Sequence, residues 1–490
     1  MADYKHGTYG EFAESIGGVA NDSGTAAVYV GAAPVNLIRG YANSVNNPVK
    51  LTDFAGVQKH FGYSKNWDSF DLCEAFKTNF DNSMGNIGPI VAINVLDPDE
   101  HKKAGTTTVP LVFVHGRAYI VSDTIILDTL VLADKVEGID YSVSYDFING
   151  RVIIKNLGDD ITGATVQATY NEVDPSAVNV AEIIGEASED GVYTGLGCIK
   201  LIYQKCGVKP NLILCPKWSE KPEVYTAMLS AASKINGHWN ADVYADIPIL
   251  DGDNKVDTRA AAKAWQEANG YVDENSKVYW PQGVGTDGNV HHVSVLAAWR
   301  TQMVDATHNG IPMESPSNKA LPVAKQYFGV GSSNRGFDHN QGNDLNESGI
   351  TTIVYWGGQW VLWGPHTAAY KHGAVTDYRN VFDTSIRMMK HILNSFQEEH
   401  ALTIDRPMTR AMADTIKNRE QEKADALVAV GALIGTPVVE FRESANSVAE
   451  LVEGNFTWDI KGTPTPPWKS GTLNVAYTTA GFDSYFGEVE

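Results

Sequence analysis

The pattern of apolar and polar residues in the first hundred positions predicts alternating strands and helices. Ala26–Val30 is a short apolar run followed by a glycine, as in a buried strand. Residues 52–61 begin with a Thr-Asp helix-start signal and place apolar residues at helical spacing, and residues 69–80 repeat that spacing. Ile90–Leu96 is a second apolar run. This order of elements favours parallel strands in an α/β core.

The pattern changes in residues 101–176, where apolar and polar residues alternate with the period of a β-strand. Every second residue in 141–147 is aromatic or β-branched, and residues 166–170 alternate again. The dipeptide Asn149-Gly150 predicts a two-residue hairpin turn between two strands. We therefore predict an all-β domain inserted into the α/β core.

Helical and strand patterns resume at about residue 178 and continue to the C-terminal part. Residues 351–364 contain two β-rich runs around Gly357-Gly358, which predicts a hairpin whose tryptophans lie in the core. A short strand is predicted in 241–249. Helices are predicted in 221–233, 257–269, 293–306, 381–398 and 408–429.

Both ends of the sequence are expected to be extended arms. Residues 1–24 are polar and glycine-rich, and they carry too little apolar surface to form a core. At the other end, alternating residues follow the Gly/Pro-rich link 462–471 and predict a final strand in about 471–480. Because open strand edges template pairing with other chains, we expect both arms to pair with neighbouring subunits. The residues expected to make these contacts are Tyr4, Tyr9, Phe12, Leu473, Val475 and Tyr477.

A chain of 490 residues is expected to form several domains, and its 43% hydrophobic content argues against global disorder. We predict a mixed α/β core (α+β) with an inserted all-β domain and extended N- and C-terminal strand arms. The predicted units are the N-terminal arm 1–24, the core 25–100 and 177–380, the inserted β domain 101–176, the C-terminal α+β domain 381–470 and the C-terminal arm 471–490.

The chain is strongly acidic, with 38 Lys plus Arg against 59 Asp plus Glu and a formal net charge of −21. Nucleic acid and anionic membrane surfaces are themselves negatively charged, so this charge disfavours both as partners. No apolar run reaches the roughly 20 residues that span a bilayer, and residues 1–24 lack the apolar segment of a secretory signal. We therefore expect a soluble protein that folds in a cytoplasm, without membrane insertion.

Motifs for catalysis, metals or cofactors are weak. Residues 283–288 fit G-x-G-x-x-G, but the next predicted helix begins too late to meet a phosphate, so a loop is expected. Residues 251–257 resemble a calcium loop that lacks its glycine and its final glutamate. Adjacent His291 and His292 would point about 100° apart on a helix, so packing or solvent contact is expected rather than a shared metal.

The four cysteines are too widely spaced for a zinc site or a disulfide scaffold, and we expect free thiols. The sequence therefore supports no catalytic, metal or cofactor site. A site assembled from distant residues would leave no local motif, so a cytoplasmic α/β enzyme with an inserted β domain stays open as an alternative.

Four segments, taken in order, resemble the tail sheath family of contractile phages. Ala26–Pro34 (AAVYVGAAP) is similar to the family's first core strand, which follows an N-terminal arm. Asn46–Val49, with the following helix that ends in Phe-Gly, is similar to the family's N-x-P-V pattern. Residues 287–323 resemble the segment in which a helix precedes S-P-(A/S)-N. The most specific match is VLWGPHTAAY (361–370), which precedes a helix that begins the family's C-terminal domain.

The resemblance implies a structural subunit without an active site. Six copies would form a ring, rings would stack helically around a tail tube, and contraction would drive the tube through the host envelope for genome ejection. The β domain would lie on the outer surface, and the C-terminal domain would face the tube. The implied partners are other copies of the chain, the tail tube protein, and the baseplate and tail terminator proteins. The implied location is the virion tail, assembled in the host cytoplasm.

Within the same class, the sheath of a contractile bacteriocin or secretion system is an equally good interpretation. The link before the final strand departs from the family's Pro-Pro-x-Pro-Ala-Glu and reads Thr-Pro-Pro-Trp-Lys, which leaves the register of that strand open. Residues 386–423 are nearly neutral within an acidic chain. Here the candidate tube contacts are Lys417, Arg419 and Lys423, and the alternative is a solvated helix with i,i+3 and i,i+4 ion pairs.

Overall fold

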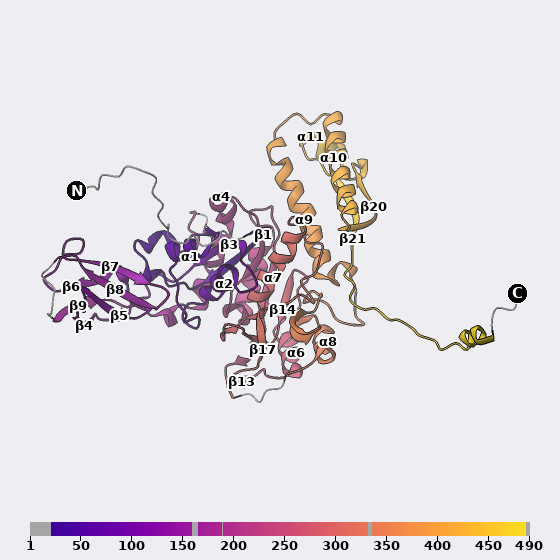
Figure 1. Cartoon of the computed structure of the whole chain (residues 1–490). Helices are drawn as coiled ribbons and strands as arrows, with labels where there is room; N and C mark the ends of the chain where they lie inside the picture. The colour runs from indigo at the N-terminus through magenta and orange to yellow at the C-terminus, as the bar shows by residue number, and fades with distance from the viewer. Residues whose placement is uncertain (1–20, 159–164, 189, 332–335, 487–490) are drawn as a thin grey trace, which may run out of the picture.

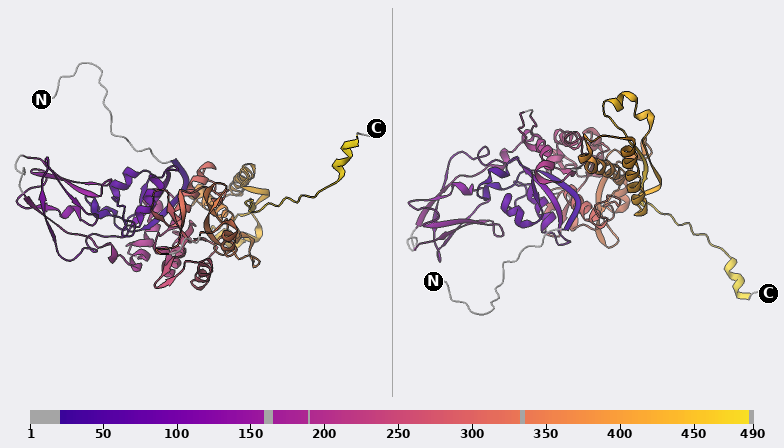
Figure 2. Two further views of the ribbon diagram at one scale, coloured as in Figure 1. Left: turned by 60° about the horizontal axis from the view of Figure 1, so that its bottom comes forward. Right: turned by 90° about the horizontal axis from the view of Figure 1, so that it is seen from above.

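The computed structural model describes residues 21–158, 165–188, 190–331 and 336–486. Figure 1 shows three parts: a β-rich end, a central core around one large sheet, and a helical part from which the C-terminal segment projects. The turned views in Figure 2 show the same arrangement. The expected arm contacts Tyr4, Tyr9 and Phe12 lie outside the described residues.

The core contains an eight-stranded sheet with the order β19-β18-β14-β11-β10-β1-β3-β2. Its inner strands pair in parallel, whereas β2 and β19 pair antiparallel at the two edges. The predicted mixed α/β fold is confirmed, because apolar runs such as Ala26–Val30 are fully buried between layers of helices. The strands are β1 (Asn21–Gly31), β2 (Val49–Leu51), β3 (Ile87–Asn94), β10 (Pro210–Leu214), β11 (Asp242–Asp246), β14 (Ser276–Tyr279), β18 (Ile350–Trp356) and β19 (Gln359–Trp363).

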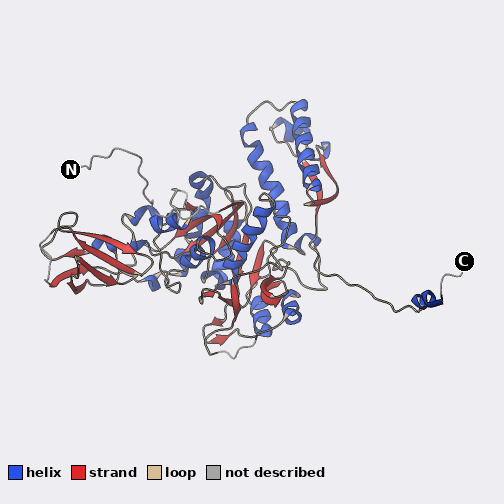
Figure 3. Ribbon diagram, viewed as in Figure 1, coloured by secondary structure: helices blue, strands red, loops and turns tan. Residues whose placement is uncertain are grey.

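Local capping explains where several core helices begin. The Asp53 carboxylate accepts a hydrogen bond from the Gly56 amide at 2.7 Å, and the Thr258 hydroxyl accepts one from the Ala261 amide at 3.2 Å. α7 is buried along most of its length and packs against β1, β3 and β11, and Figure 3 shows helices flanking the strands of the core. The core helices are α1 (Phe54–His60), α2 (Leu72–Phe80), α3 (Val180–Ile184), α4 (Ile202–Cys206), α5 (Pro222–Ala232), α6 (Arg259–Ala268), α7 (Val293–Thr307) and α8 (His339–Asn346).

The strands between β3 and α3 form two three-stranded sheets, β4-β9-β6 and β5-β8-β7, around a second hydrophobic core. The predicted two-residue turn at Asn149-Gly150 is wrong, because Asp146 pairs with Arg151 and the loop spans residues 147–150. The Asp146 carboxylate holds this longer loop by accepting hydrogen bonds from the amide and the side chain of Asn149. The strands are β4 (Thr107–Val112), β5 (Arg117–Val121), β6 (Val131–Leu132), β7 (Tyr141–Asp146), β8 (Arg151–Asn156) and β9 (Thr165–Tyr170).

Two stretches that the sequence left without regular structure form small antiparallel pairings. The G-x-G-x-x-G stretch begins in β15 (Gln282–Gly285), which pairs with β16 (Val290–His291) and β17 (Val323–Tyr327), so the expected loop is in part a strand. The acidic stretch at 251–257 contributes to an exposed hairpin of β12 (Leu250–Asp251) and β13 (Asn254–Lys255).

The C-terminal part begins with α9 (Asp383–His400) and α10 (Arg410–Ala429), followed by β20 (Leu433–Glu440), α11 (Val448–Val452) and β21 (Asp459–Pro464). β20 and β21 form an antiparallel two-stranded sheet, and α10 packs on β20. Within the ranges that the structure describes, no helix has the length and apolar character that crossing a bilayer requires.

The helix predicted in 381–398 forms as α9, and it lies against polar groups of the core. Leu393 is 50% exposed, whereas Arg387 and Asn394 are buried. The strand predicted at about 471–480 is not formed within the single chain. Residues 465–479 have no regular structure, and a 3-10 turn (Ala480–Phe486) follows them.

Candidate assembly site

The C-terminal segment leaves the protein directly after β21. The Thr465 amide donates to the Ala432 carbonyl at 3.1 Å, and its hydroxyl donates to the Gly431 carbonyl at 2.6 Å. Beyond this anchor, among the described residues, no backbone hydrogen bond joins 466–478 to the rest of the chain. This segment is the C-terminal arm, and Figure 1 shows it projecting away from the core.

The predicted contact residues of the C-terminal arm all face solvent. Leu473, Val475 and Tyr477 are 86%, 85% and 82% exposed. In an extended chain their spacing of two places all three side chains on one face. Three large apolar side chains on one strand face are costly to leave in water, so the C-terminal arm is suited to a surface outside its own chain.

A two-stranded sheet of β20 and β21 lies directly before the C-terminal arm. Its register runs from the pair of Leu433 with Pro464 to the pair of Glu440 with Asp459, and no third described strand joins it. Ile434, Val438 and Ile460 on these strands are partly exposed apolar residues. A sheet of two strands is marginal by itself, and its outer edges carry main-chain groups that can pair with an added strand.

The N-terminal segment joins the core at a close contact between β1 and the turn after α7. A Cβ placed on Gly24 would lie 2.9 Å from the Gly310 Cα. One residue further on, the Thr25 hydroxyl donates to Asp305 Oδ2 at 2.6 Å. The start of the described chain is therefore tied to the C-terminal end of α7.

Asp305 also binds α9, through a buried ion pair with Arg387. The pKa of Arg387 is raised, because the charge of Asp305 outweighs the opposing effect of burial. A second buried pair joins Lys277 of β14 to Asp383 at the first turn of α9. Both pairs lie where the C-terminal part meets the core.

Two further polar residues extend this contact along α9. Lys390 Nζ donates to the Ala241 carbonyl and to Asp242 Oδ1, both at 2.8 Å. Asn394 donates to the Asn240 carbonyl at 2.9 Å and accepts from the Asn240 amide at 3.1 Å. The residues of this polar stripe are Asp383, Arg387, Lys390 and Asn394, which follow one face of the helix. The C-terminal part is therefore attached to the core by a fixed set of polar contacts.

Two of the three candidate tube contacts have partners inside the chain. Arg419 and Lys423 on α10 both form ion pairs with Glu399 of α9, and Lys423 also pairs with Glu420 at 3.0 Å. Only the Lys423–Glu420 pair has the i,i+3 spacing of the alternative, since Glu399 lies on another helix. Lys417 is half-buried, and no ion pair involves it within the described ranges.

The two segments with the most specific resemblance to the sheath family lie together. The Gly364 amide donates to Ser317 Oγ at 3.0 Å, and the Asn318 amide donates to the Leu362 carbonyl at 2.6 Å. Both segments line a cavity of about 610 Å³ that reaches the start of the C-terminal arm at Trp468. The prediction that the hairpin tryptophans are core residues is wrong for Trp356, which is exposed.

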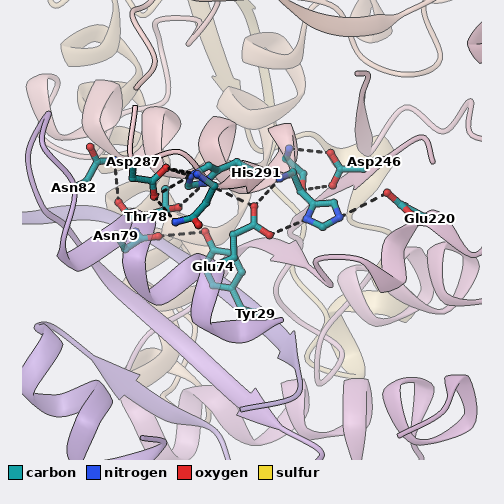
Figure 4. A network of polar contacts seen from close by, with 12 residues as sticks. Tyr29, Glu74, Thr78, Asn79, Asn82, Glu220, Asp246, Asp287 and His291 are labelled. Atoms are coloured by element: carbon teal, nitrogen blue, oxygen red, sulfur yellow. Dashed lines mark hydrogen bonds and ion pairs between the residues drawn. The ribbon is translucent and has the colours of Figure 1, made fainter. Parts of the chain in front are cut away.

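The adjacent histidines, for which packing or solvent contact was expected, belong to a buried polar network (Figure 4). The His292 amide donates to Glu74 Oε1 at 2.6 Å, and its Nδ1 lies 2.7 Å from Glu74 Oε2. His291 Nε2 lies 3.2 Å from Asp287 Oδ1, while its Nδ1 lies 3.5 Å from the Thr78 hydroxyl. Glu74 lies far from the histidines in the sequence, so local spacing carried no signal for its contact with His292.

The network occupies the carboxyl-terminal edge of the parallel strands, where Asp246 ends β11. Proteins with such sheets bind ligands at this edge. Here the chain's own side chains fill the position, and Asp246 accepts from the Ser294 amide at 3.0 Å. No group of three or more His, Cys, Asp or Glu in the described part of the chain is arranged to hold a metal ion. All four cysteines are free thiols.

No protein-family model matches the chain. Its fold is similar to that of a chain in the anti-feeding prophage baseplate, with a TM-score of 0.55, 12% identity, and coverage of 98% of this chain and 100% of that chain. It is also similar to the sheath complex of the extracellular contractile injection system PVC in its contracted state, with a TM-score of 0.53, 10% identity, and coverage of 98% and 99%. The fold is therefore that of proteins from contractile injection particles.

Relatives found by sequence show which proteins of such particles this chain resembles. The tail sheath protein of Burkholderia phage BcepMu is 26% identical over 487 residues, which covers 92% of this chain and 91% of the relative. The tail sheath protein of Escherichia phage P2 is 24% identical over 307 residues, which covers 62% and 72%. The resemblance to the contractile tail sheath family is confirmed: the chain is a homologue of phage tail sheath proteins. These homologues are structural proteins, so the prediction that the chain is not an enzyme is confirmed as well.

Proposed function

We propose that this chain is the structural subunit of a contractile tail sheath that polymerises through its C-terminal arm. One observation supports the proposal: the same molecule contains an extended segment without a partner and a sheet with open edges. The alternating Leu473, Val475 and Tyr477 need an apolar, hydrogen-bonding surface, and the β20–β21 sheet needs further strands. Homology to tail sheath proteins supports the same function.

The C-terminal arm of one copy adds to the edge of the β20–β21 sheet in a neighbouring copy. About 15 residues separate the Thr465 anchor from the terminal 3-10 turn, which gives a reach of roughly 50 Å in an extended chain. Strand addition supplies main-chain hydrogen bonds between the arm and the neighbouring copy. These bonds remain when the two copies rotate relative to each other, because an extended arm joins them. The N-terminal arm, residues 1–24 with Tyr4, Tyr9 and Phe12, makes the corresponding connection on another neighbour.

Six copies form a ring, and the rings stack helically around a tail tube. The core slides between an extended and a contracted packing of the same subunit, and the difference in contact energy between the packings drives the tube into the host envelope. The domain of β4–β9 lies on the outer surface. The C-terminal part faces the tube, where Lys417 is the candidate contact, since Arg419 and Lys423 are held by Glu399.

The partners are further copies of the chain, the tail tube protein, the baseplate and the tail terminator. The particle is a phage tail assembled in the host cytoplasm, or a contractile bacteriocin or secretion machine of the same design. The mechanism requires no cofactor and no nucleotide hydrolysis, because the energy is stored in the packing of the subunits.

Negative-stain microscopy of the purified chain tests the proposal. We expect hollow tubes or stacked rings from the full chain, and single particles from a variant that lacks residues 471–490. A variant that lacks residues 1–20 should form rings or tubes with weakened connections. Single particles from the full chain at high concentration would overturn the sheath assignment, and tubes of unchanged strength from both truncations would overturn the role of the arms.

A further inference from the structure

Three carboxylates from different elements converge on His292 at the start of α7. Glu74 of α2 lies 2.7 Å from His292 Nδ1, and Glu220, in the 3-10 turn Trp218–Glu220, lies 3.6 Å from Nε2. Asp246 of β11 binds the first turn of α7 through the amide and the hydroxyl of Ser294. Figure 4 shows Glu74, Glu220 and Asp246 within this network. We call Glu74, Glu220, Asp246 and His292 the acid–histidine cluster.

The acid–histidine cluster is buried on one side and partly open on the other. Glu74 and Asp246 are 2% exposed, whereas the side chains of His292 and Glu220 are 16% and 20% exposed. One oxygen of Glu220 is buried without a hydrogen-bond partner in the described structure. Buried carboxylates need a cation or donors, because each unpaired charge in the interior costs several kcal/mol. Within the cluster, the imidazolium of His292 is the one cation that can balance these carboxylates.

Among the described residues, no lysine or arginine supplies a second buried cation to the cluster. On α2, Asp71 is a further carboxylate, bound by the Trp218 indole and the Ala32 amide. Beside the 3-10 turn, the exposed Lys217 and Lys221 act on Asp71 and Glu220 only at a distance. On β16, His291 Nε2 lies 3.2 Å from Asp287 Oδ1, and His291 Nδ1 lies 3.9 Å from Glu74 Oε1, so a second imidazole also faces the cluster.

The acid–histidine cluster lies at the start of α7, a helix that contacts both terminal parts of the chain at its other end. The N-cap residue of α7 is His292 itself, which makes no side-chain capping bond, so Asp246 supplies the cap from another strand. At its other end, α7 carries Asp305, which binds Thr25 at the start of β1 and Arg387 on α9. One helix therefore links the cluster to both places where the terminal parts join the core.

We propose that the acid–histidine cluster is a proton-dependent latch that holds α7 in the core. With His292 protonated, the cation binds Glu74 and balances Asp246 and Glu220. Loss of that proton leaves three buried carboxylates facing one another, which repels the start of α7 from α2 and from β11. The latch concerns the subunit alone, and it does not depend on the proposed sheath function.

The protonation equilibria agree with this geometry. Burial by itself would lower the pKa of His292, but the charge and hydrogen bond of Glu74 and the charges of Asp246 and Glu220 raise it to about 10. Burial raises the pKa of Glu220 to about 7 and also raises that of Asp246. The folded state therefore binds these protons more tightly than the unfolded state does.

The direction of the pH dependence follows from these raised pKa values. The contribution of Glu220 to stability is complete below its ordinary pKa of 4.5 and is lost as the pH rises to about 7. The contribution of His292 is complete below 6.5 and is lost as the pH rises to about 10. Between pH 7 and pH 9 His292 releases nearly one proton for each molecule that unfolds, which raises the unfolding constant by nearly tenfold per pH unit. Toward pH 9 the four cysteine thiols, whose pKa values burial raises above the ordinary 9.0, add a further rise that does not involve His292.

Urea unfolding of the full chain between pH 7 and pH 9, followed by tryptophan fluorescence, tests the latch. The wild-type unfolding constant should rise with pH by nearly tenfold per unit more than that of His292→Gln. Glu220→Gln removes a repelling carboxylate and should remain folded, with a smaller rise than the wild type because the pKa of His292 falls. His292→Gln keeps a donor for Glu74 but cannot titrate, so its unfolding constant should be higher at pH 7 and should rise only through the other titrating groups, the thiols above all.

Glu223→Gln, at an exposed position on α5, is the matched control and should show the wild-type pH dependence. The protection factors of the α7 amides, which are corrected for base-catalysed exchange, should fall with pH in the wild type as the unfolding constant rises. A wild-type unfolding constant that changes less than twofold between pH 7 and pH 9 would overturn the proposal. So would wild-type pH dependence in Glu220→Gln, which decides the matter even if His292→Gln fails to fold.

Discussion

The guanidinium of Arg387 on α9 and the carboxylate of Asp305 on α7 form an ion pair from which water is excluded. Nη1 lies 3.3 Å from Oδ1, Nη2 contacts Oδ2, and the two side chains are 5% and 0% exposed. The same carboxylate accepts a hydrogen bond from Thr25. A single buried charge thus connects the first residues of the core sheet with the helix that begins the C-terminal part.

Asp305→Asn is expected to lower the free energy of unfolding by about 3–5 kcal/mol, because it leaves the charge of Arg387 buried and unpaired. Urea denaturation of the purified chain measures this loss. Arg410→Gln is the control, since it breaks an exposed i,i+4 pair with Asp414 and should change stability by at most about 1 kcal/mol. Equal losses in the two variants would show that the buried pair adds nothing.

Gly24→Ala is expected to destabilise the chain more than the same change at Gly40. Both glycines have positive φ, 68° and 67°, so both substitutions carry a similar backbone cost of about 1 kcal/mol. Only at Gly24 would the new methyl group collide with backbone, at the Gly310 Cα, which adds about 1–3 kcal/mol. Denaturation midpoints of the two variants give the difference, and similar midpoints would contradict the close packing of β1 on the turn after α7.

Val475→Pro is expected to abolish assembly without changing the stability of the monomer. Proline removes the main-chain donor that strand addition requires, whereas the residue is 85% exposed in the single chain. Sedimentation measures assembly, and thermal unfolding at low concentration measures the monomer. Val475→Thr keeps the donor and the β-branched shape, so it should still assemble. Assembly of the proline variant at the wild-type concentration would exclude pairing through this residue.

Lys417→Glu is expected to weaken cosedimentation with the tail tube by about tenfold while the sheath subunits still assemble. One removed contact between charges corresponds to about 1–2 kcal/mol, and the effect should shrink at high salt. Lys371→Glu makes the same charge change at an exposed position on the core. If both variants lose the same affinity for the tube, the loss is due to the net charge of the chain, and Lys417 is not a contact.

Several elements could be predicted because their causes are local. The apolar run 26–30 identified a buried parallel strand, and the helix predicted in 257–269 is α6, which Thr258 caps. The hairpin around Gly357-Gly358 was predicted because positive φ at both glycines suits a tight turn. The prediction of a two-residue turn at 149–150 was wrong, because the Asp146 carboxylate binds the Asn149 amide and holds a longer loop. The dipeptide Asn149-Gly150 alone does not reveal that contact.

The contacts between distant segments could not be predicted. The polar stripe of α9 looked like part of an ordinary amphipathic helix, because the partners of Arg387 and Lys390 lie about 80 and 150 residues away in the chain. The same holds for His292, whose nearest carboxylate is on α2. In both cases burial changes a solvated side chain into one that requires a specific partner.

The sequence by itself determined the mixed α/β class, the β-rich segment, the resemblance to tail sheath proteins and an alternating C-terminal segment without a core of its own. These features depend on composition and on short-range periodicity. Only the tertiary structure decided that this segment leaves beside an incomplete two-stranded sheet, that α9 is attached through polar contacts, and that the adjacent histidines meet buried acids. Such features depend on which segments pack together, and packing is decided by the free energy of the whole chain rather than by any one segment.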